Sequence, residues 1–267
     1  MPRLKDEVLL LTDQQREEFE TKGFIRIQAF AADEARAMED AMWTFLQTIH
    51  GIDREDRSTW AHIYPSGLQP HKKHPVFDPI NSPELLATID ELMGKGKWEP
   101  PPHWGQFLVT FPETGRVWDV PYEWHTDYGF TESGDKLFGL LALIYVSDVP
   151  ERSGGTGVIS GSHHLVKQYV RTQNKQALGK MKRVRKALRS VNPWMTELNT
   201  EGEPLERIER FMNQDTECSG IPLRVVDLSG SPGDIILGHP WLLHSSSHNC
   251  GKLPRMMRVQ RLQAVGQ

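Results

Sequence analysis

The first polar and apolar positions of the chain predict a short helix followed by a strand. Thr12 and Gln15 have the spacing of a capping box, in which each side chain bonds the other residue's backbone N–H. Gly23 is suited to end this helix, because a helix commonly stops at a residue with positive φ. Residues 24–27 then alternate between apolar and polar positions, which predicts a strand.

Two further helices are predicted before residue 100. One covers residues 33–50 and stops at Gly51, and its apolar positions recur at helical spacing. Another begins with Ser82 as N-cap, followed by Pro83, and extends to residue 93. We expect residues 1–100 to form a helical layer that supports one face of a sheet. The apolar stripe of the second helix consists of Ala35, Met38, Met42, Phe45 and Ile49.

Beyond residue 100 the pattern changes to strands separated by Gly, Pro and Asp turns. Such a series predicts an antiparallel double sheet, a jelly roll. The expected fold class is therefore mostly β with α: a double-stranded β-helix core in residues 101–267, within one catalytic domain spanning 1–267. The strand-like runs cover residues 106–111, 137–146, 224–228, 233–244 and 255–262.

A basic helical segment interrupts these strands. Eight Lys or Arg and no acid lie between Arg171 and Arg189, and an acid-rich stretch follows at 197–217. We expect an insertion at about 165–220 that is solvated and whose two charge blocks pair. The alternative is a lid whose basic side chains meet an anionic substrate. Nucleic-acid binding is disfavoured, because the segment lacks interleaved aromatic residues and the chain has a net charge of −4.

Composition adds limits on the class of protein. The 267 residues suffice for a substantial core, and the two cysteines, Cys218 and Cys250, do not describe a disulfide scaffold. The chain contains no apolar run of about 18 residues, which a membrane helix would need. We therefore expect a cytoplasmic protein that does not enter the membrane.

Candidate chemistry centres on His125 and Asp127. Residues at i and i+2 of a strand share a face, so this pair could bind one cation together with a third ligand. His244, which closes the run 233–244, is the candidate third ligand, and His239 and His248 flank it. Two histidines and a carboxylate leave open metal positions, as non-haem Fe(II) oxygenases require.

A carboxylate-binding group follows eleven residues after His244, at Arg255. A hairpin between the runs 233–244 and 255–262 would bring its guanidinium near the metal, where it could bind a keto-acid cosubstrate bidentately. Ser246 would lie on the same side as His244 in an extended chain. Gln106 and Thr110 share a face of an earlier strand, and we favour Gln106 as the donor to the cosubstrate's metal-side carboxylate. Thr156, in a glycine-rich turn, is a further candidate.

The chain carries a series of motifs in order: residues 11–25, Trp124-His125-x-Asp127, 153–163, 233–246 and Pro254-Arg255. Through these motifs, and across most of its length, the sequence resembles the phytanoyl-CoA dioxygenase (PhyH)-like Fe(II)/2-oxoglutarate oxygenases. The resemblance implies His125, Asp127 and His244 as iron ligands, with Arg255 and Ser246 on 2-oxoglutarate. The eleven-residue step to Arg255 favours His244 over His248, which would require Arg258 or Arg261 instead.

The resemblance also implies a reaction. Fe(II), 2-oxoglutarate and O₂, with ascorbate as an additional reductant, would oxidise a C–H bond of a small-molecule metabolite and release succinate and CO₂. A small metabolite, either an amino acid derivative or a natural-product intermediate, is the favoured substrate, and an acyl-CoA is the alternative. A homodimer is compatible with the sequence. Related halogenases carry Gly or Ala where Asp127 stands, so hydroxylation, desaturation or cyclisation is expected. The alternatives are a cupin-like metal-dependent dioxygenase or isomerase without 2-oxoglutarate, and a non-catalytic binding protein.

Overall fold

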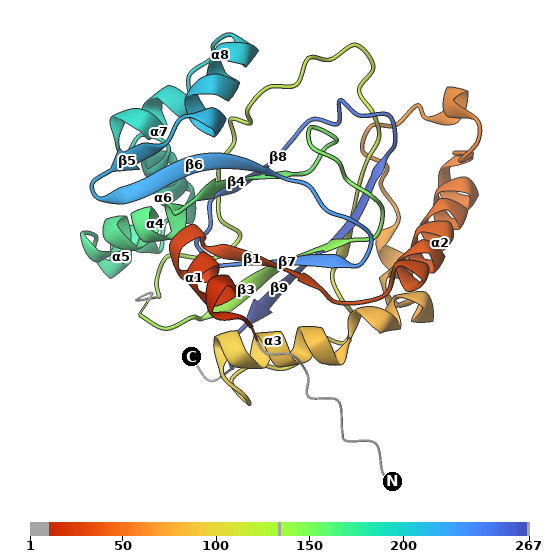
Figure 1. Cartoon of the computed structure of the whole chain (residues 1–267), viewed down its shortest axis with the longest axis horizontal. Coiled ribbons are helices and arrows are strands. Elements are labelled where there is room, and N and C mark those ends of the chain that lie inside the picture. Colours follow the sequence, from red (N-terminus) through yellow and green to blue (C-terminus); the bar gives the residue numbers. More distant parts are fainter. Residues whose placement is uncertain (1–10, 133–134, 266–267) are drawn as a thin grey trace.

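Two antiparallel sheets form the centre of the protein (Figure 1). The computed structural model describes residues 11–132 and 135–265. The larger sheet has the strand order β1-β7-β3-β9-β2 and the smaller one β5-β6-β4-β8. The fold is the predicted jelly roll. The strands are β1 (Phe24–Gln28), β2 (Gln106–Thr110), β3 (Gly139–Tyr145), β4 (Thr156–Ser160), β5 (Thr216–Cys218), β6 (Ile221–Leu228), β7 (Asp234–Gly238), β8 (His244–Ser246) and β9 (Arg255–Gln263).

The two sheets face each other across a shared apolar interior. This interior joins Leu143, Ile236 and Met257 of the larger sheet to Val158 and Leu228 of the smaller one. Strand β3 is buried along its whole length, which explains why its sequence is a continuous apolar run rather than an alternating one.

The N-terminal helices cover the outer face of the larger sheet, as the sequence predicts (Figure 1). Their apolar side chains pack against outward residues of that sheet, for example Ile235 and Met256. One predicted core position is wrong: Ile49, at the end of its stripe, is 37% exposed. The helices are α1 (Asp13–Lys22), α2 (Ala32–His50) and α3 (Pro83–Met93), with the short 3₁₀ turns η1 (Arg57–Thr59), η2 (Gln69–Lys73) and η3 (Pro75–Ile80) between α2 and α3.

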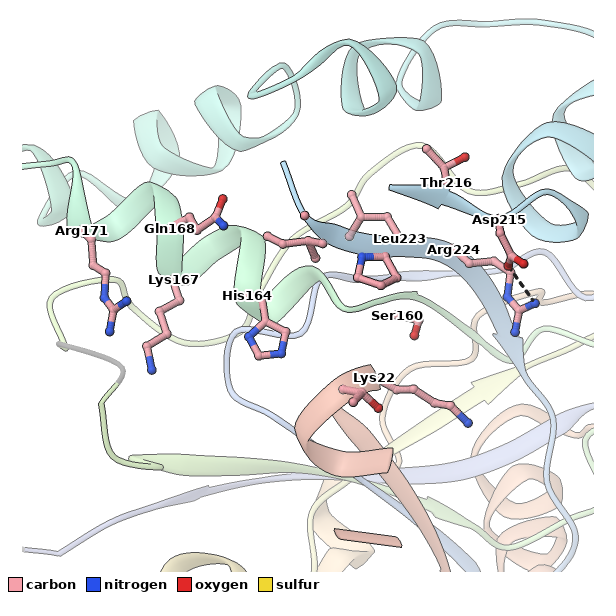
Figure 2. A pocket seen from close by; sticks show the side chains of 14 residues that line it. Lys22, Ser160, His164, Lys167, Gln168, Arg171, Asp215, Thr216, Leu223 and Arg224 are labelled. Carbon is pink, nitrogen blue, oxygen red and sulfur yellow. Dashed lines mark ion pairs between the residues drawn. The ribbon is translucent and has the colours of Figure 1, made fainter. Parts of the chain in front are cut away.

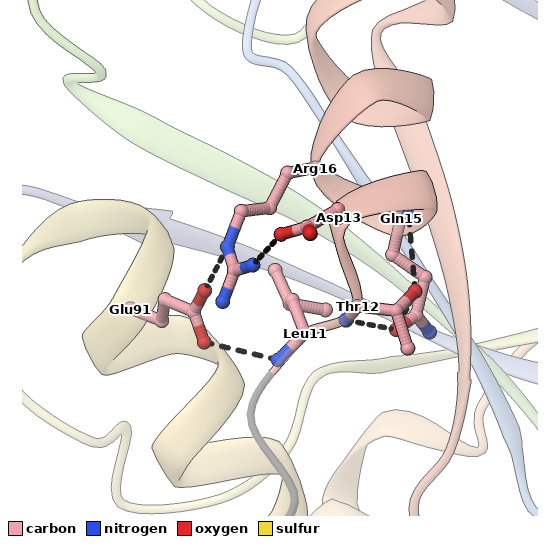
Figure 3. A network of polar contacts seen from close by, with 6 residues as sticks. All are labelled: Leu11, Thr12, Asp13, Gln15, Arg16 and Glu91. Atoms are coloured by element: carbon pink, nitrogen blue, oxygen red, sulfur yellow. Dashed lines mark hydrogen bonds and ion pairs between the residues drawn. The ribbon is translucent and has the colours of Figure 1, made fainter.

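The start of α1 is fixed by the predicted capping box (Figure 3). The Gln15 amide donates to the Thr12 hydroxyl at 3.2 Å, and the Thr12 amide donates to the Gln15 side chain at 2.9 Å. The Arg16 Nε donates to Glu91 at 2.6 Å, so this helix is also tied to α3. At its other end Gly23 has a φ of 85°, the conformation that the sequence predicts.

A helical segment lies between β4 and β5 and covers the outer face of the smaller sheet. Its Leu165, Val184 and Trp194 pack in one cluster with Ile159 and Val225 of the sheet. No ion pair among the described residues joins the basic and the acidic block, so the expected pairing of these blocks is not found. The helices are α4 (Ser162–Arg171), α5 (Lys175–Leu178), α6 (Met181–Leu188), α7 (Pro193–Leu198) and α8 (Pro204–Ile208), followed by the π-helical turn η4 (Glu209–Asn213).

The predicted strand-like run 233–244 is two strands that belong to different sheets. The chain leaves β7, makes a turn in which the Leu242 amide donates to the His239 carbonyl at 2.8 Å, and enters β8 in the smaller sheet. Pro240 lacks an N–H for a sheet ladder, which favours this break. Strand β9 pairs with β2 and β3, so the expected hairpin between the two runs is wrong.

Among the described residues, no helix is long and apolar enough to cross a membrane.

Candidate metal and cosubstrate site

His125, Asp127 and His244 converge at one edge of the smaller sheet. Their ligand atoms all lie within 4.8 Å of one another. The Nε2 atoms of His125 and His244 are each 3.9 Å from an oxygen of Asp127. We call these three residues the triad. Two reciprocal backbone bonds, at 3.0 and 2.9 Å, hold the segment of His125 against His244. His125 forms a single β-bridge and Asp127 lies in the bend that follows, so the two residues are not on a regular strand.

Backbone carbonyls orient both imidazoles. Nδ1 of His125 lies 2.9 Å from the Glu123 carbonyl, and Nδ1 of His244 lies 3.0 Å from that of Leu242. If each Nδ1–H donates to its carbonyl, each Nε2 presents a lone pair toward Asp127. Burial, reinforced by the neighbouring His125, lowers the pKa of His244 to about 4, so this ring is neutral near pH 7. Two imidazoles and a carboxylate form a donor set that fits Fe(II).

The two flanking histidines have other partners. His248 lies with its Nδ1 2.6 Å from Glu113 and its Nε2 2.6 Å from Arg116. His239 packs against His163 and accepts the Trp241 amide at Nδ1. Within the described part of the chain, the triad is the one group of three His, Cys, Asp or Glu side chains that is placed to hold a metal ion. The structure therefore brings His244, rather than His239 or His248, together with His125 and Asp127.

Arg255 is a buried cation with no acidic partner among the described residues. It is 5% exposed, its Nη2 donates to the Thr110 hydroxyl at 2.7 Å, and no described residue bonds its Nε. Burial lowers its pKa to about 10, which leaves the guanidinium charged at neutral pH. A buried charge without a counterion is costly, so this position is suited to an incoming anion.

The other predicted cosubstrate residues are divided between two places. Ser246 of β8 pairs with Thr156 of β4. This pair lies two positions along from the His244–Val158 pair, so its side chains are on the same face of the smaller sheet as His244. Thr156 begins a strand, so its assignment to a turn is wrong. Thr110 is the register partner of Arg255, whereas Gln106 pairs with Val259. Four strand residues span about 13 Å, so Gln106 lies well away from Arg255. It lines a cavity that Asp127 also lines.

One residue at the site was not anticipated individually. Arg185, on α6 of the basic segment, donates from Nη2 to the carbonyl of Thr126, the residue between His125 and Asp127. It is partly buried, and its Nε has no hydrogen-bond partner within the described part of the chain. The run of basic residues was the only sequence signal, and it did not distinguish Arg185 from its neighbours.

The fold and the site thus define a jelly-roll protein with a position for one metal ion. A family model described as phytanoyl-CoA dioxygenase (PhyH) matches residues 19–257. The chain belongs to the phytanoyl-CoA dioxygenase family, as the sequence motifs predicted. No curated protein matches the sequence.

Several solved structures share the fold at low sequence identity. AviO1 from Streptomyces viridochromogenes Tue57 is 16% identical, with a TM-score of 0.54 over 95% of both chains. HygX from Streptomyces hygroscopicus, with nickel and 2-oxoglutarate bound, is 18% identical, with a TM-score of 0.52 over 97% of this chain and 89% of that one. EctD from S. alaskensis, with 2-oxoglutarate and 5-hydroxyectoine, is 18% identical, with a TM-score of 0.54 over 96% and 77%.

Proposed function

We propose that the protein is an Fe(II)- and 2-oxoglutarate-dependent oxygenase that oxidises an unactivated C–H bond of a small-molecule metabolite. The observation that carries this proposal is Arg255, a buried cation without an acidic partner in the described residues, in a jelly roll that also assembles the triad. Membership of the phytanoyl-CoA dioxygenase family supports it. So do the 2-oxoglutarate-bound structures of HygX and EctD, which share the fold.

Each side chain has a role in this proposal. His125, Asp127 and His244 would hold Fe(II). The bound iron would supply the redox chemistry that couples conversion of 2-oxoglutarate and O₂ into succinate and CO₂ to oxidation of the substrate. Arg255, oriented by Thr110, would bind the distal carboxylate of 2-oxoglutarate.

Three further residues are candidates for the same cosubstrate. Ser246 and Thr156 would offer hydroxyl groups from the face that carries His244. Gln106, which shares a cavity with Asp127, stays a candidate donor to the metal-side carboxylate. Trp124 and Thr126, which flank His125 in the sequence, are buried, so the segment that carries His125 would be shielded from bulk water on their side.

Asp127 favours hydroxylation or a related C–H oxidation over halogenation. Its carboxylate would take the metal position that a halide would need in a halogenase, and its two oxygens lie 3.9 Å from the Nε2 atoms of His125 and His244. A fold neighbour, SnoN from nogalamycin biosynthesis, is an α-ketoglutarate-dependent epimerase, at 15% identity and a TM-score of 0.53 over 94% of this chain and 81% of that one. This neighbour supports a natural-product intermediate as the substrate.

The test is succinate formation from 2-oxoglutarate under O₂ by Fe(II)-loaded protein, alone and with small-molecule metabolites added. We expect succinate from the wild type and none from His244→Ala. His248→Ala is the matched control, because its imidazole lies close in sequence but bonds Glu113. Equal succinate formation by wild type and His244→Ala would contradict the proposal. So would an absence of succinate from wild-type protein that holds both iron and 2-oxoglutarate.

A further inference from the structure

Asp127 lines a cavity of about 600 Å³ at the end of the barrel formed by the start of β2 and the end of β9. This volume is typical of a site for a small molecule, which needs roughly 300–1,000 Å³. Of the three triad residues, Asp127 lines this cavity, so a molecule bound in the cavity would lie beside the proposed metal. The polar residues His103, Gln106, Gln260, Arg261 and Gln263 also line it.

We infer that this cavity receives a small substrate carrying a carboxylate or phosphate group, and that Arg261 binds that anion. The inference rests on the proposed function and adds the chemical class of its substrate. A guanidinium matches either anion bidentately, which makes the anionic group the shared chemistry.

Arg261 is placed to bind a different anion from the one that Arg255 would bind. The two arginines lie six residues apart on β9 and share a face by strand parity, so about 20 Å of strand separates them. Arg255 is buried beside Thr110 near one end of the interior, whereas Arg261 is exposed at the other end. An anion at Arg261 would therefore be separate from a 2-oxoglutarate carboxylate at Arg255.

The charges of the cavity favour an anion. Its charged lining groups are Arg261 and Asp127, and a metal bound to the triad would neutralise the latter. Within the described residues, no ion pair engages Arg261, while Gln106, Gln260 and Gln263 are neutral amides. His103 lines the same cavity, and its buried Nδ1 has no hydrogen-bond partner among the described residues. Because no acid of the described residues pairs with it, the Arg261 guanidinium is free to bind a substrate group.

A second cavity of about 600 Å³ has more cations but is a poorer candidate (Figure 2). It lies on the outer side of β6 and α4, and no triad residue lines it. Most of its cations already face acids: Lys22 pairs with Glu18 at 2.9 Å, Arg171 with Asp135 at 3.0 Å. In Figure 2 the dashed line joins Arg224 to Asp215, a pair 3.7 Å apart. This outer cavity supplies control positions for the test.

The test measures binding by ligand-observed saturation-transfer NMR, with diamagnetic Zn(II) in place of iron and saturating 2-oxoglutarate. The probes are small carboxylic acids paired with their primary amides, and phosphomonoesters paired with their parent alcohols. We expect members of one anionic series to bind at least about tenfold more tightly than their neutral partners, and which series does so distinguishes carboxylate from phosphate. Arg261→Gln should remove this preference, Arg261→Lys should retain part of it, and Arg171→Gln, in the outer cavity, should leave it unchanged.

Two results would overturn the inference. One is an absence of any preference for the charged partner in the wild type, including an absence of binding by every pair. The other is a preference that survives in Arg261→Gln. Calorimetry of 2-oxoglutarate on the same samples separates the two proposals, because wild-type protein that binds 2-oxoglutarate but shows no anion preference contradicts this inference alone. Protein that fails to bind 2-oxoglutarate contradicts the proposed function.

Discussion

Replacing Arg255 with methionine tests whether this buried cation binds 2-oxoglutarate. Methionine keeps an apolar stem of similar length and removes the guanidinium, whose one hydrogen-bond partner among the described residues is Thr110. Removing one partner of a buried, hydrogen-bonded charge pair costs about 2–5 kcal/mol of binding free energy. At about 1.4 kcal/mol per factor of ten, we expect the Kd of 2-oxoglutarate to rise by roughly 30-fold or more.

The assay is isothermal titration calorimetry of Zn(II)-loaded protein with 2-oxoglutarate. Arg255→Lys should bind with intermediate affinity, because it keeps the charge but loses the planar fork that matches a carboxylate. Arg224→Met is the control, since Arg224 is an exposed arginine of β6 that pairs with Asp215.

A second readout separates binding from a structural role. Without 2-oxoglutarate, Arg255 is a buried charge lacking a counterion in the described residues, so we expect Arg255→Met to unfold in urea at no lower denaturant concentration than the wild type. An unchanged Kd would refute the reasoning. A large loss of stability in the absence of 2-oxoglutarate would refute it too, because that result would assign the arginine to the fold.

Three further predictions follow from contacts around the site and the core. Thr110→Val removes the hydroxyl that orients Arg255, and calorimetry should show 2-oxoglutarate binding weakened about fivefold, as expected for one hydrogen bond of about 1 kcal/mol. Arg185→Gln releases the segment between two triad residues, and competition with a chelator should show Fe(II) affinity reduced about tenfold, whereas Arg183→Gln, on the same helix but exposed, should not change it. Burial lowers the pKa of His163 to about 3, so the unfolded chain takes up a proton near pH 6.5 that the native state does not bind. Stability should therefore fall as the pH drops from about 6.5 toward 3, by up to about 1.4 kcal/mol per pH unit, and urea unfolding should show a shallower dependence in His163→Gln.

Each of these predictions has a result that contradicts it. For Thr110→Val it is wild-type affinity for 2-oxoglutarate, and for the α6 pair it is an equal effect of Arg185→Gln and Arg183→Gln. For His163 it is the same pH dependence of unfolding in the variant and the wild type. That last result would assign the acid sensitivity to other groups, such as the neighbouring His239, whose pKa burial also lowers.

The sequence predicted the features that depend on local spacing. Thr12, Gln15 and Gly23 define α1 through bonds within a few residues, and the structure contains each of these contacts. The i and i+2 relation brought His125 and Asp127 together even without a regular strand.

Features that depend on strand partners could not be predicted in the same way. Gln106 and Thr110 have the same parity, and only the register between β2 and β9 places Thr110, rather than Gln106, opposite Arg255. The break between β7 and β8 likewise depends on which sheet each strand joins. The contact of Arg185 with Thr126 joins segments 59 residues apart, and no periodicity encodes such a contact.

Absorbance of the protein with Fe(II) and 2-oxoglutarate under anaerobic conditions tests the central claim most directly, because a visible charge-transfer band forms only when the cosubstrate chelates bound iron. We predict a band in the wild type, a weaker one in Arg255→Met at limiting 2-oxoglutarate, and none in His244→Ala. Wild-type protein that holds iron and develops no band would contradict the account and favour a cupin-like metal protein that does not use 2-oxoglutarate.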